Sequence, residues 1–132
     1  MNAKSFVDTN IWVYAHLNKA EDAKWEKANR LVETLDNLVI STQVMSEYYA
    51  VMLKNRVEDG WIQDNLEEMA KYCELVPIDL TGIRAAHRIR LRYRFSYWDS
   101  LIIASALQAR CSVLYSEDMQ AGQEIEDYLR IE

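Results

Sequence analysis

The sequence contains few of the residues that usually interrupt regular structure, with three glycines and one proline among 132 residues. This shortage argues against an all-β fold with many tight turns and favours helices joined by short loops. Half of the residues are hydrophobic, which excludes a disordered chain. A chain of this length buries enough surface on folding to form its own core, so we expect one domain over residues 1–132.

Cysteines and long hydrophobic segments are also scarce. The two cysteines, Cys73 and Cys111, have neither the spacing of a metal site nor that of a redox pair, so we expect reduced, half-buried thiols. No window is long and apolar enough for a transmembrane helix, and the N-terminal residues lack the apolar run and cleavage site of a signal peptide. These absences predict a cytoplasmic protein that does not associate with a membrane.

Segments typical of strands and of helices alternate along the chain. Short apolar segments predict strands at residues 4–7, 38–40, 75–78 and 112–115, and a last edge strand near Leu129. Apolar residues at helical spacing predict helices at residues 11–17, 21–36, 42–55, 59–72, 80–94 and 98–109, with Ser41 or Thr42 as the N-cap of the third. The last helix is apolar on nearly every side and should be buried. The alternation predicts an α/β fold with a mostly parallel central sheet.

Acidic residues stand where such a fold places its ligands, which bind beyond the carboxyl ends of parallel strands. Asp8 follows the first predicted strand and Asp118 follows the strand at residues 112–115, so both should face one crevice. Asp99 opens the apolar helix, where an unpaired charge is costly. Glu47 lies within a helix. Each has an ordinary alternative explanation, with Asp8 as a turn residue, Asp99 as a helix cap and Glu47 as a solvated surface residue.

Taken together, these four acids form a ligand set for a hard cation. Carboxylates that share a cleft repel one another and raise one another's pKa values. Mg²⁺ or Mn²⁺ prefers oxygen ligands and removes this repulsion. Such a site can polarise a phosphoryl oxygen and activate a water for attack on it. The uncharged polar residues beside the acids are candidates for orienting them by hydrogen bonding: Thr9, Asn10, Ser100 and Ser116.

Four segments resemble, in order, the motifs of the PIN-domain nucleases: FVDTNIWVYA, SEYYAVML, SYWDSLIIASAL and LYSEDMQAG. The resemblance runs from Phe6 to about Gly122 and is closest to the VapC toxins of bacterial toxin–antitoxin pairs. It implies that Asp8, Glu47, Asp99 and Asp118 are the catalytic, metal-binding acids. It further implies a three-layer α/β/α fold, RNA cleavage that depends on Mg²⁺ or Mn²⁺, a homodimer, and neutralisation by a cognate antitoxin.

The fourth motif leaves the identity of the last acid open, because Glu117 and Asp118 are adjacent. We prefer Asp118, since it takes the place of the family's acid that stands second after a hydroxyl residue, here Ser116. Glu117 is then an auxiliary group beside the metal site.

Arginine is concentrated in one window of a chain whose formal net charge is −6. A negative total does not favour nucleic-acid binding, yet residues 84–94 hold five of the fifteen basic residues, just before the apolar helix. This density predicts that Arg90, Arg92 and Arg94 contact RNA phosphates. A solvated helix face and an ion-paired interface with an acidic partner are the alternatives.

Other functions fit the sequence less well. A catalytically inactive PIN-like module that binds RNA or a protein is the main alternative, and the presence of all four acids counts against it. A phosphatase with Asp8 as nucleophile needs an acid two residues later, where Asn10 stands, and a receiver domain needs a late lysine, whereas none follows Lys71. The aromatic residues, including Trp98, are expected in the core or a dimer interface rather than against bases, with Tyr97 the exception.

Overall fold

The computed structural model describes residues 3–17 and 23–132. Its strands are β1 (Ser5–Val7), β2 (Leu38–Ser41), β3 (Glu74–Val76), β4 (Val113–Tyr115), β5 (Glu124–Ile125) and β6 (Leu129–Ile131). Its helices are α1 (Thr9–Leu17), α2 (Ala23–Thr34), α3 (Thr42–Lys54), α4 (Asp59–Tyr72), α5 (Leu80–Tyr93) and α6 (Tyr97–Gln108). The predicted start of the second helix, at residues 21 and 22, lies outside the described residues.

The strands form one sheet in the order β3-β2-β1-β4-β6-β5, and only β5 runs antiparallel to its neighbour. Strand β1 is central, since Phe6 pairs with Val39 of β2 on one side and with Leu114 of β4 on the other. The last residues of β1 and β4, Val7 and Tyr115, pair with each other. The chain therefore leaves both strands side by side at the carboxyl edge of the sheet, as predicted for a mostly parallel sheet.

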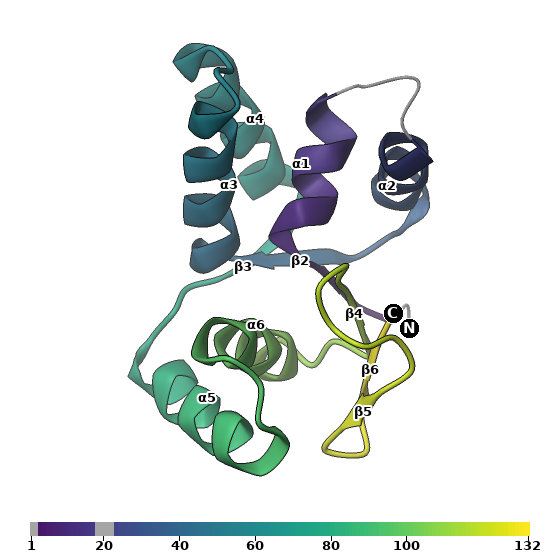
Figure 1. Ribbon diagram of the computed structural model, residues 1–132, viewed down its shortest axis with the longest axis vertical. Helices are drawn as coiled ribbons and strands as arrows, with labels where there is room; N and C mark the ends of the chain where they lie inside the picture. Colours follow the sequence, from purple (N-terminus) through teal and green to yellow (C-terminus); the bar gives the residue numbers. More distant parts are fainter. Residues whose placement is uncertain (1–2, 18–22) are drawn as a thin grey trace.

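Helices cover both faces of the sheet, which gives the three-layer α/β/α arrangement that the resemblance implies. Figure 1 shows α1 to α4 on one side and α5 with α6 on the other, with the two termini close together. Helix α6 is buried at every residue from Ser100 to Ala106, as its apolar sequence predicts. Strand β1 is buried along its whole length, so the core encloses the strand that leads directly to Asp8.

Two element boundaries differ from the predictions for local reasons. Strand β3 ends at Val76 and not at Ile78, because Pro77 has no N–H to continue the ladder. The N–H of Ile78 donates instead to the hydroxyl of Thr42 at 3.1 Å. Of the two predicted N-cap candidates for α3, Thr42 is therefore engaged elsewhere. The N-cap is Ser41, whose Oγ accepts the N–H of Val44 at 3.3 Å.

The C-terminal strands correct one prediction. The strand near Leu129 was expected at the edge of the sheet, but β6 lies between β4 and β5. The loop between β5 and β6 places Glu126 (φ 54°) and Asp127 (φ 55°) in the left-handed region of backbone conformation. Hairpin loops usually fill such positions with Asn or Gly. The Glu-Asp pair carries no such signal, which is why β5 was not predicted.

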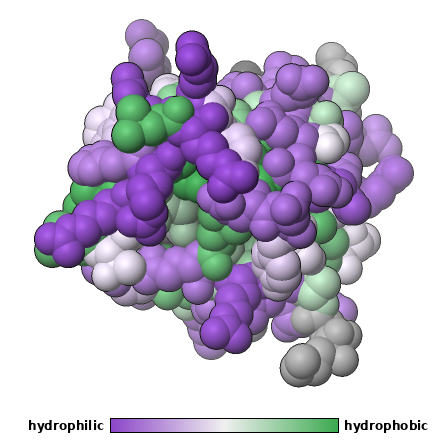
Figure 2. Space-filling view, turned by 90° about the horizontal axis from the view of Figure 1, so that it is seen from below, coloured by the Kyte–Doolittle hydropathy of each residue, from purple (hydrophilic) through white to green (hydrophobic). Residues whose placement is uncertain are grey.

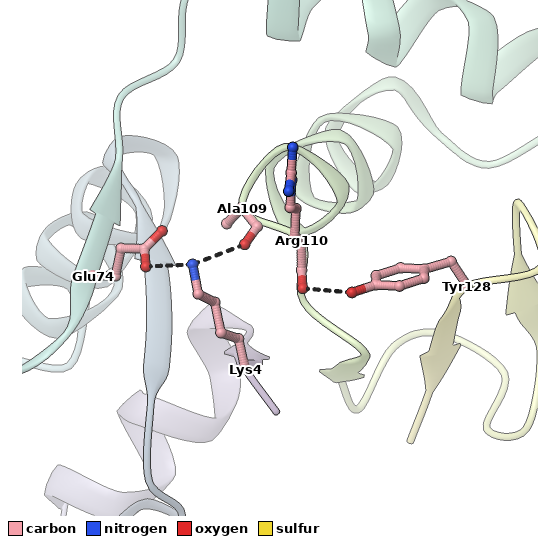
Figure 3. A network of polar contacts seen from close by, with 5 residues as sticks. All are labelled: Lys4, Glu74, Ala109, Arg110 and Tyr128. Carbon is pink, nitrogen blue, oxygen red and sulfur yellow. Dashed lines mark hydrogen bonds and ion pairs between the residues drawn. The ribbon is translucent and has the colours of Figure 1, made fainter. Parts of the chain in front are cut away.

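A polar network fixes the amino edge of the sheet, opposite Asp8 (Figure 3). The ammonium of Lys4 lies 2.8 Å from a carboxylate oxygen of Glu74 and donates to the carbonyl of Ala109 at 3.2 Å. The hydroxyl of Tyr128 donates to the carbonyl of Arg110 at 3.0 Å. An exposed ion pair of this kind contributes little stability. Its structural consequence is to hold the C-terminal end of α6 at this edge, so that the N-terminal end of α6 points towards the carboxyl edge.

A second polar network joins α1, α3 and α4, which lie on the face of the sheet opposite α5 and α6. Tyr48 of α3 is fully buried, and its hydroxyl lies 2.6 Å from Nδ1 of His16 in α1. The side-chain amide of Asn65 in α4 donates to the same hydroxyl at 3.1 Å. Burial lowers the pKa of His16, which favours the neutral imidazole beside the tyrosine hydroxyl. His16 therefore connects α1 with α3 inside this helical layer.

Two further expectations can be compared with the structure. Cys73 and Cys111 are free thiols, but both are buried rather than half-buried, and burial raises the pKa of Cys73 to about 11 and that of Cys111 to about 12. Within residues 3–17 and 23–132, none of the helices combines the length and the apolar character that crossing a membrane requires.

Candidate active site

A cleft of about 230 Å³ opens at the carboxyl edge of the sheet. The four acids singled out in the sequence all line it, although they come from four separate places in the chain: Asp8 after β1, Glu47 in α3, Asp99 at the start of α6, and Asp118 in the loop after β4. The parallel pairing of β1 with β4 places two of them at adjacent strand ends. Helices α3 and α6 supply the other two from opposite faces of the sheet.

Asp8 is the most buried of these acids, with 8% of its surface exposed. One carboxylate oxygen accepts the N–H of Thr9 at 2.7 Å, and the other accepts the hydroxyl of Ser116 at 2.9 Å. The pKa of Asp8 is raised from 3.8 to about 6, chiefly by burial; the charges of Glu47 and Asp99 add to the rise, and the two hydrogen bonds oppose it. The ionised carboxylate is therefore present at neutral pH at a cost in free energy.

Glu47 is half-buried in α3, so its interpretation as a solvated surface residue is wrong. The hydroxyl of Thr9 donates to one of its carboxylate oxygens at 2.8 Å. The backbone N–H of Thr9 meanwhile bonds Asp8. A single threonine thus links two acids of the cleft. The sequence predicted that Thr9 orients an acid but did not show which acids it contacts.

Asp99 lies in the first turn of α6 but is not its cap. The N-cap is Ser96, whose Oγ accepts the N–H of Asp99 at 3.1 Å, so the capping explanation for Asp99 is wrong. Partial burial raises the pKa of Asp99, the charge of Asp118 raises it further, and a hydrogen bond with the Ser96 side chain lowers it. The carboxylate of Asp99 therefore interacts both with the charge of Asp118 and with the side chain of Ser96.

The side chains of Asp118 and Glu117, which are adjacent in the sequence, lie in different places. Asp118 lines the cleft and accepts the side-chain N–H of Asn10 at 3.0 Å. Glu117 turns away from the cleft, pairs with Lys24 at 2.8 Å, and lines a separate cavity of about 400 Å³ that Tyr14 also lines. The auxiliary role expected for Glu117 beside the metal site does not fit this position.

Ser100 is also placed differently from the expectation. It is fully buried in α6, and its hydroxyl donates to the carbonyl of Ser96 at 2.8 Å. Its adjacency to Asp99 in sequence does not bring its hydroxyl to a carboxylate, because successive residues of a helix point in different directions. Among the four polar neighbours of the acids, Thr9, Asn10 and Ser116 contact an acid of the cleft.

Two residues that the sequence argument did not assign to the site also line the cleft. Gln43 is 9% exposed, and its side-chain amide donates to the carbonyl of Trp98 at 3.2 Å. Trp98 is 62% exposed, so of its two expected places the core is wrong and the dimer interface stays a prediction. Gln43 stands four residues before Glu47 on the same face of α3, and that spacing was the available signal.

The cleft suits a hard divalent cation by the chemistry of its four acids, which offer carboxylate oxygens. Within the described part of the chain, no three Asp, Glu, His or Cys side chains are gathered as a ready-made metal-binding group. Mg²⁺ keeps several waters and is commonly held by one or two carboxylates, so it does not require such a group. Burial is the main cause of the raised pKa values of Asp8 and Asp99, and the charges of neighbouring acids add to it, so a bound cation would favour the ionised form of both.

Comparison with known proteins agrees with the motifs. A family model described as PIN domain matches residues 5–122, which confirms the resemblance seen in the sequence. A search of curated proteins found no match.

Solved structures share the fold. A toxin–antitoxin complex from Klebsiella pneumoniae has a TM-score of 0.73 at 17% identity, over 96% of this chain and 95% of that one. VapC20 of Mycobacterium tuberculosis, a sarcin–ricin loop cleaving toxin, has a TM-score of 0.71 at 16% identity, over 87% and 92%. DNA-bound VapBC from Salmonella typhimurium has a TM-score of 0.69 at 17% identity, over 99% and 98%.

Replacing Asp8 with Asn should stabilise the metal-free protein at pH 7. The folded state raises the pKa of Asp8, so ionisation disfavours folding; a rise of about two units corresponds to roughly 3 kcal/mol. Asn keeps an acceptor for Thr9 and a donor for Ser116, so we expect a gain of about 1–3 kcal/mol in the free energy of unfolding. Urea denaturation in EDTA measures it.

The gain should shrink as the pH falls through 6 and vanish below 3.8, where Asp8 is protonated in both the folded and the unfolded wild type. Asp64→Asn, at an exposed position of α4, is the control and should change little. A less stable Asp8→Asn variant at pH 7 would contradict the proposed cost of the buried charge.

Proposed function

Because the chain belongs to the PIN-domain family, we propose that it is an endoribonuclease that requires Mg²⁺ or Mn²⁺ and hydrolyses RNA phosphodiester bonds. The observation that carries this proposal is the cleft in which carboxylates from four separate segments meet. A structural module would have no reason to gather four negative charges, since each raises the free energy of the others. We further propose that residues 1–132 act as one domain.

Asp8, Glu47, Asp99 and Asp118 are the proposed metal-binding acids. A bound Mg²⁺ or Mn²⁺ would polarise a phosphoryl oxygen and lower the pKa of a water for attack on phosphorus. The residues around the acids fix their orientation: Thr9 bonds both Asp8 and Glu47, Ser116 bonds Asp8, and Asn10 bonds Asp118. This arrangement leaves the acids positioned before substrate arrives, and a preorganised site reduces the reorganisation that the reaction requires.

RNA phosphates are the proposed partners of the arginines at the C-terminal end of α5. Arg90, Arg92 and Arg94 are all exposed, and Arg92 also pairs with Glu126 at 2.7 Å. The connection from α5 to α6 is short, so these arginines come shortly before Asp99 in the chain. The surface seen from the side of α5 and α6 is mostly hydrophilic, with hydrophobic side chains visible in its hollow (Figure 2).

We also propose that the chain is the toxin of a toxin–antitoxin pair. The support is that structures of the same fold include a complex named as toxin–antitoxin and a toxin that cleaves the sarcin–ricin loop. On this proposal the chain acts in the cytoplasm as a homodimer and is neutralised by a cognate antitoxin. The preferred RNA of this chain is set by its own cleft and not by the substrates of those proteins.

Purified protein should cleave a mixed RNA pool with Mg²⁺ or Mn²⁺ and should not cleave it in EDTA. Asp8→Asn and Asp99→Asn should each remove the cleavage, because each takes one charged ligand from the proposed metal site. Gel analysis of the RNA over time measures it, and Asp64→Asn on exposed α4 is the matched control. Full activity in either site variant would reject the site, and metal binding with no cleavage of any RNA would favour an inactive PIN-like module.

The two adjacent acids of the last motif should behave differently. Asp118→Asn should reduce cleavage strongly, because Asp118 lines the cleft, whereas Glu117→Gln should retain most of the activity, because Glu117 pairs with Lys24 outside it. Initial cleavage rates of the two variants at a single Mg²⁺ concentration measure the contrast. The opposite ranking would show that Glu117 is the fourth ligand.

Induced expression of the wild-type chain alone should arrest the growth of a bacterial host. Asp8→Asn expressed to the same level should not, because the proposed toxicity requires cleavage. Growth curves with immunoblots for protein level measure it. Equal arrest by both chains would show that toxicity does not depend on the acids, and normal growth with active wild-type enzyme would separate the nuclease from the toxin role.

A further inference from the structure

Trp98 exposes a large aromatic surface beside the acidic cleft. It is 62% exposed and precedes Asp99 at the start of α6, and it is one of the residues that line the cleft. Exposing this much of an indole ring to water is unfavourable, and folding could have placed the ring in the core with the rest of α6. What distinguishes Trp98 from the other exposed apolar residues is its place beside four carboxylates, where a bound ligand would cover the ring.

Neighbouring groups hold this ring in place. The side-chain amide of Gln43 donates to the backbone carbonyl of Trp98, which fixes the start of α6 against α3. The ring of Tyr97 meets that of Trp98 edge-on, with centroids 5.1 Å apart and planes at 69°. Tyr97 is itself in contact with the ring of His87 from α5, with centroids 5.8 Å apart. A T-shaped contact uses at most one face of the indole, and a ring that is 62% exposed keeps the other face available.

Gln43 gives an independent indication of a ligand in the same cleft. Its amide nitrogen must face the carbonyl of Trp98, because a carbonyl only accepts hydrogen bonds. Its Oε1 therefore faces away, is buried, and has no hydrogen-bond partner among the described residues. A buried acceptor without a donor costs about 1–3 kcal/mol. A ligand that brings an N–H or O–H group beneath Trp98 would remove that cost.

We propose that Trp98 is a stacking platform for an unpaired RNA base, with Gln43 accepting a hydrogen bond from the same nucleotide. This inference rests on the proposed function and names its substrate class: single-stranded RNA, or an unpaired loop or bulge. Bases within a duplex are already stacked on their neighbours, so they cannot cover the ring. Stacking tolerates any base, because every base has an aromatic face. The cleft thus selects an exposed nucleotide next to the carboxylates.

The test is RNA binding in the Asp8→Asn background, where cleavage does not consume the probe. Fluorescence anisotropy of a labelled RNA of about twelve nucleotides without self-complementarity gives the dissociation constant, and the annealed duplex of the same sequence is the comparison. The variants are Trp98→Ala, Trp98→Phe and Gln43→Leu. The control is Trp61→Ala, which removes another exposed tryptophan, 42% exposed, from α4. Light scattering gives the oligomeric mass of each.

Trp98→Ala should weaken single-strand binding about 10-fold or more, the loss typical of one stacked base, and Trp98→Phe should restore most of it. Gln43→Leu should weaken binding as well, Trp61→Ala should not, and the duplex should bind more weakly without responding to Trp98→Ala. Unchanged binding in Trp98→Ala, or equal loss for single strand and duplex, would overturn the platform.

A change of oligomeric mass in Trp98→Ala without a specific loss of single-strand binding would also overturn it and would assign the ring to a subunit interface. In either case, cleavage of RNA by the wild type would still support the proposed nuclease function. Failure of the proposed function is recognised separately, because the wild type would then cleave no RNA with Mg²⁺ or with Mn²⁺, whether or not it binds RNA.

Discussion

The arrangement of the cleft depends on one buried charge, the carboxylate of Asp8. It stands at the end of the central strand, where β1 and β4 finish side by side, and it is nearly inaccessible to water. Such a charge is tolerated only with hydrogen bonds or a counterion. The N–H of Thr9 and the hydroxyl of Ser116 supply the hydrogen bonds, and both residues follow directly on the ends of the strands. The sheet therefore positions the charge and its partners together.

Glu47 and Asp99 reach the cleft because α3 and α6 are held in place at their ends. The N-cap of α3 at Ser41 starts that helix directly after β2, so Glu47 comes one and a half turns into it, within reach of Thr9. Helix α6 is held at its C-terminal end by Lys4 and begins at Ser96, which brings Asp99 to the same edge. No single element makes the cleft, and a shift in either helix would separate the acids.

The sequence predicts the alternation of elements and the four acids better than it predicts their contacts. Strand ends are visible as apolar runs that stop at Asp8 and before Asp118, so their convergence follows from the rule for parallel sheets. The outward turn of Glu117 is not visible in this way, because it depends on Lys24 from α2. The hairpin of β5 and β6 is missed because its left-handed positions hold Glu126 and Asp127.

Trp98 shows why residue type alone misleads within a buried helix. The pattern from Trp98 to Ala109 is apolar on nearly every side, and periodicity gives no reason to separate its first residue from the rest. The first turn of a helix, however, projects beyond the layer that the following turns fill. At the carboxyl edge of the sheet this first turn borders the cleft. Trp98 and Ile103 are both apolar, but Ile103 is buried and Trp98 is exposed, because they lie at different heights along the helix.

The electrostatics of the chain bear on how RNA could approach. A net charge of −6 and a cleft lined by four carboxylates repel phosphates, so attraction must come from a bound cation and from the arginines of α5. Both contributions weaken as salt screens them. Stacking on Trp98 does not depend on charge and is the proposed contribution that salt leaves in place. Binding of a base and binding of a phosphate would then respond differently to ionic strength, and an acidic protein could still hold an unpaired nucleotide at its carboxylates.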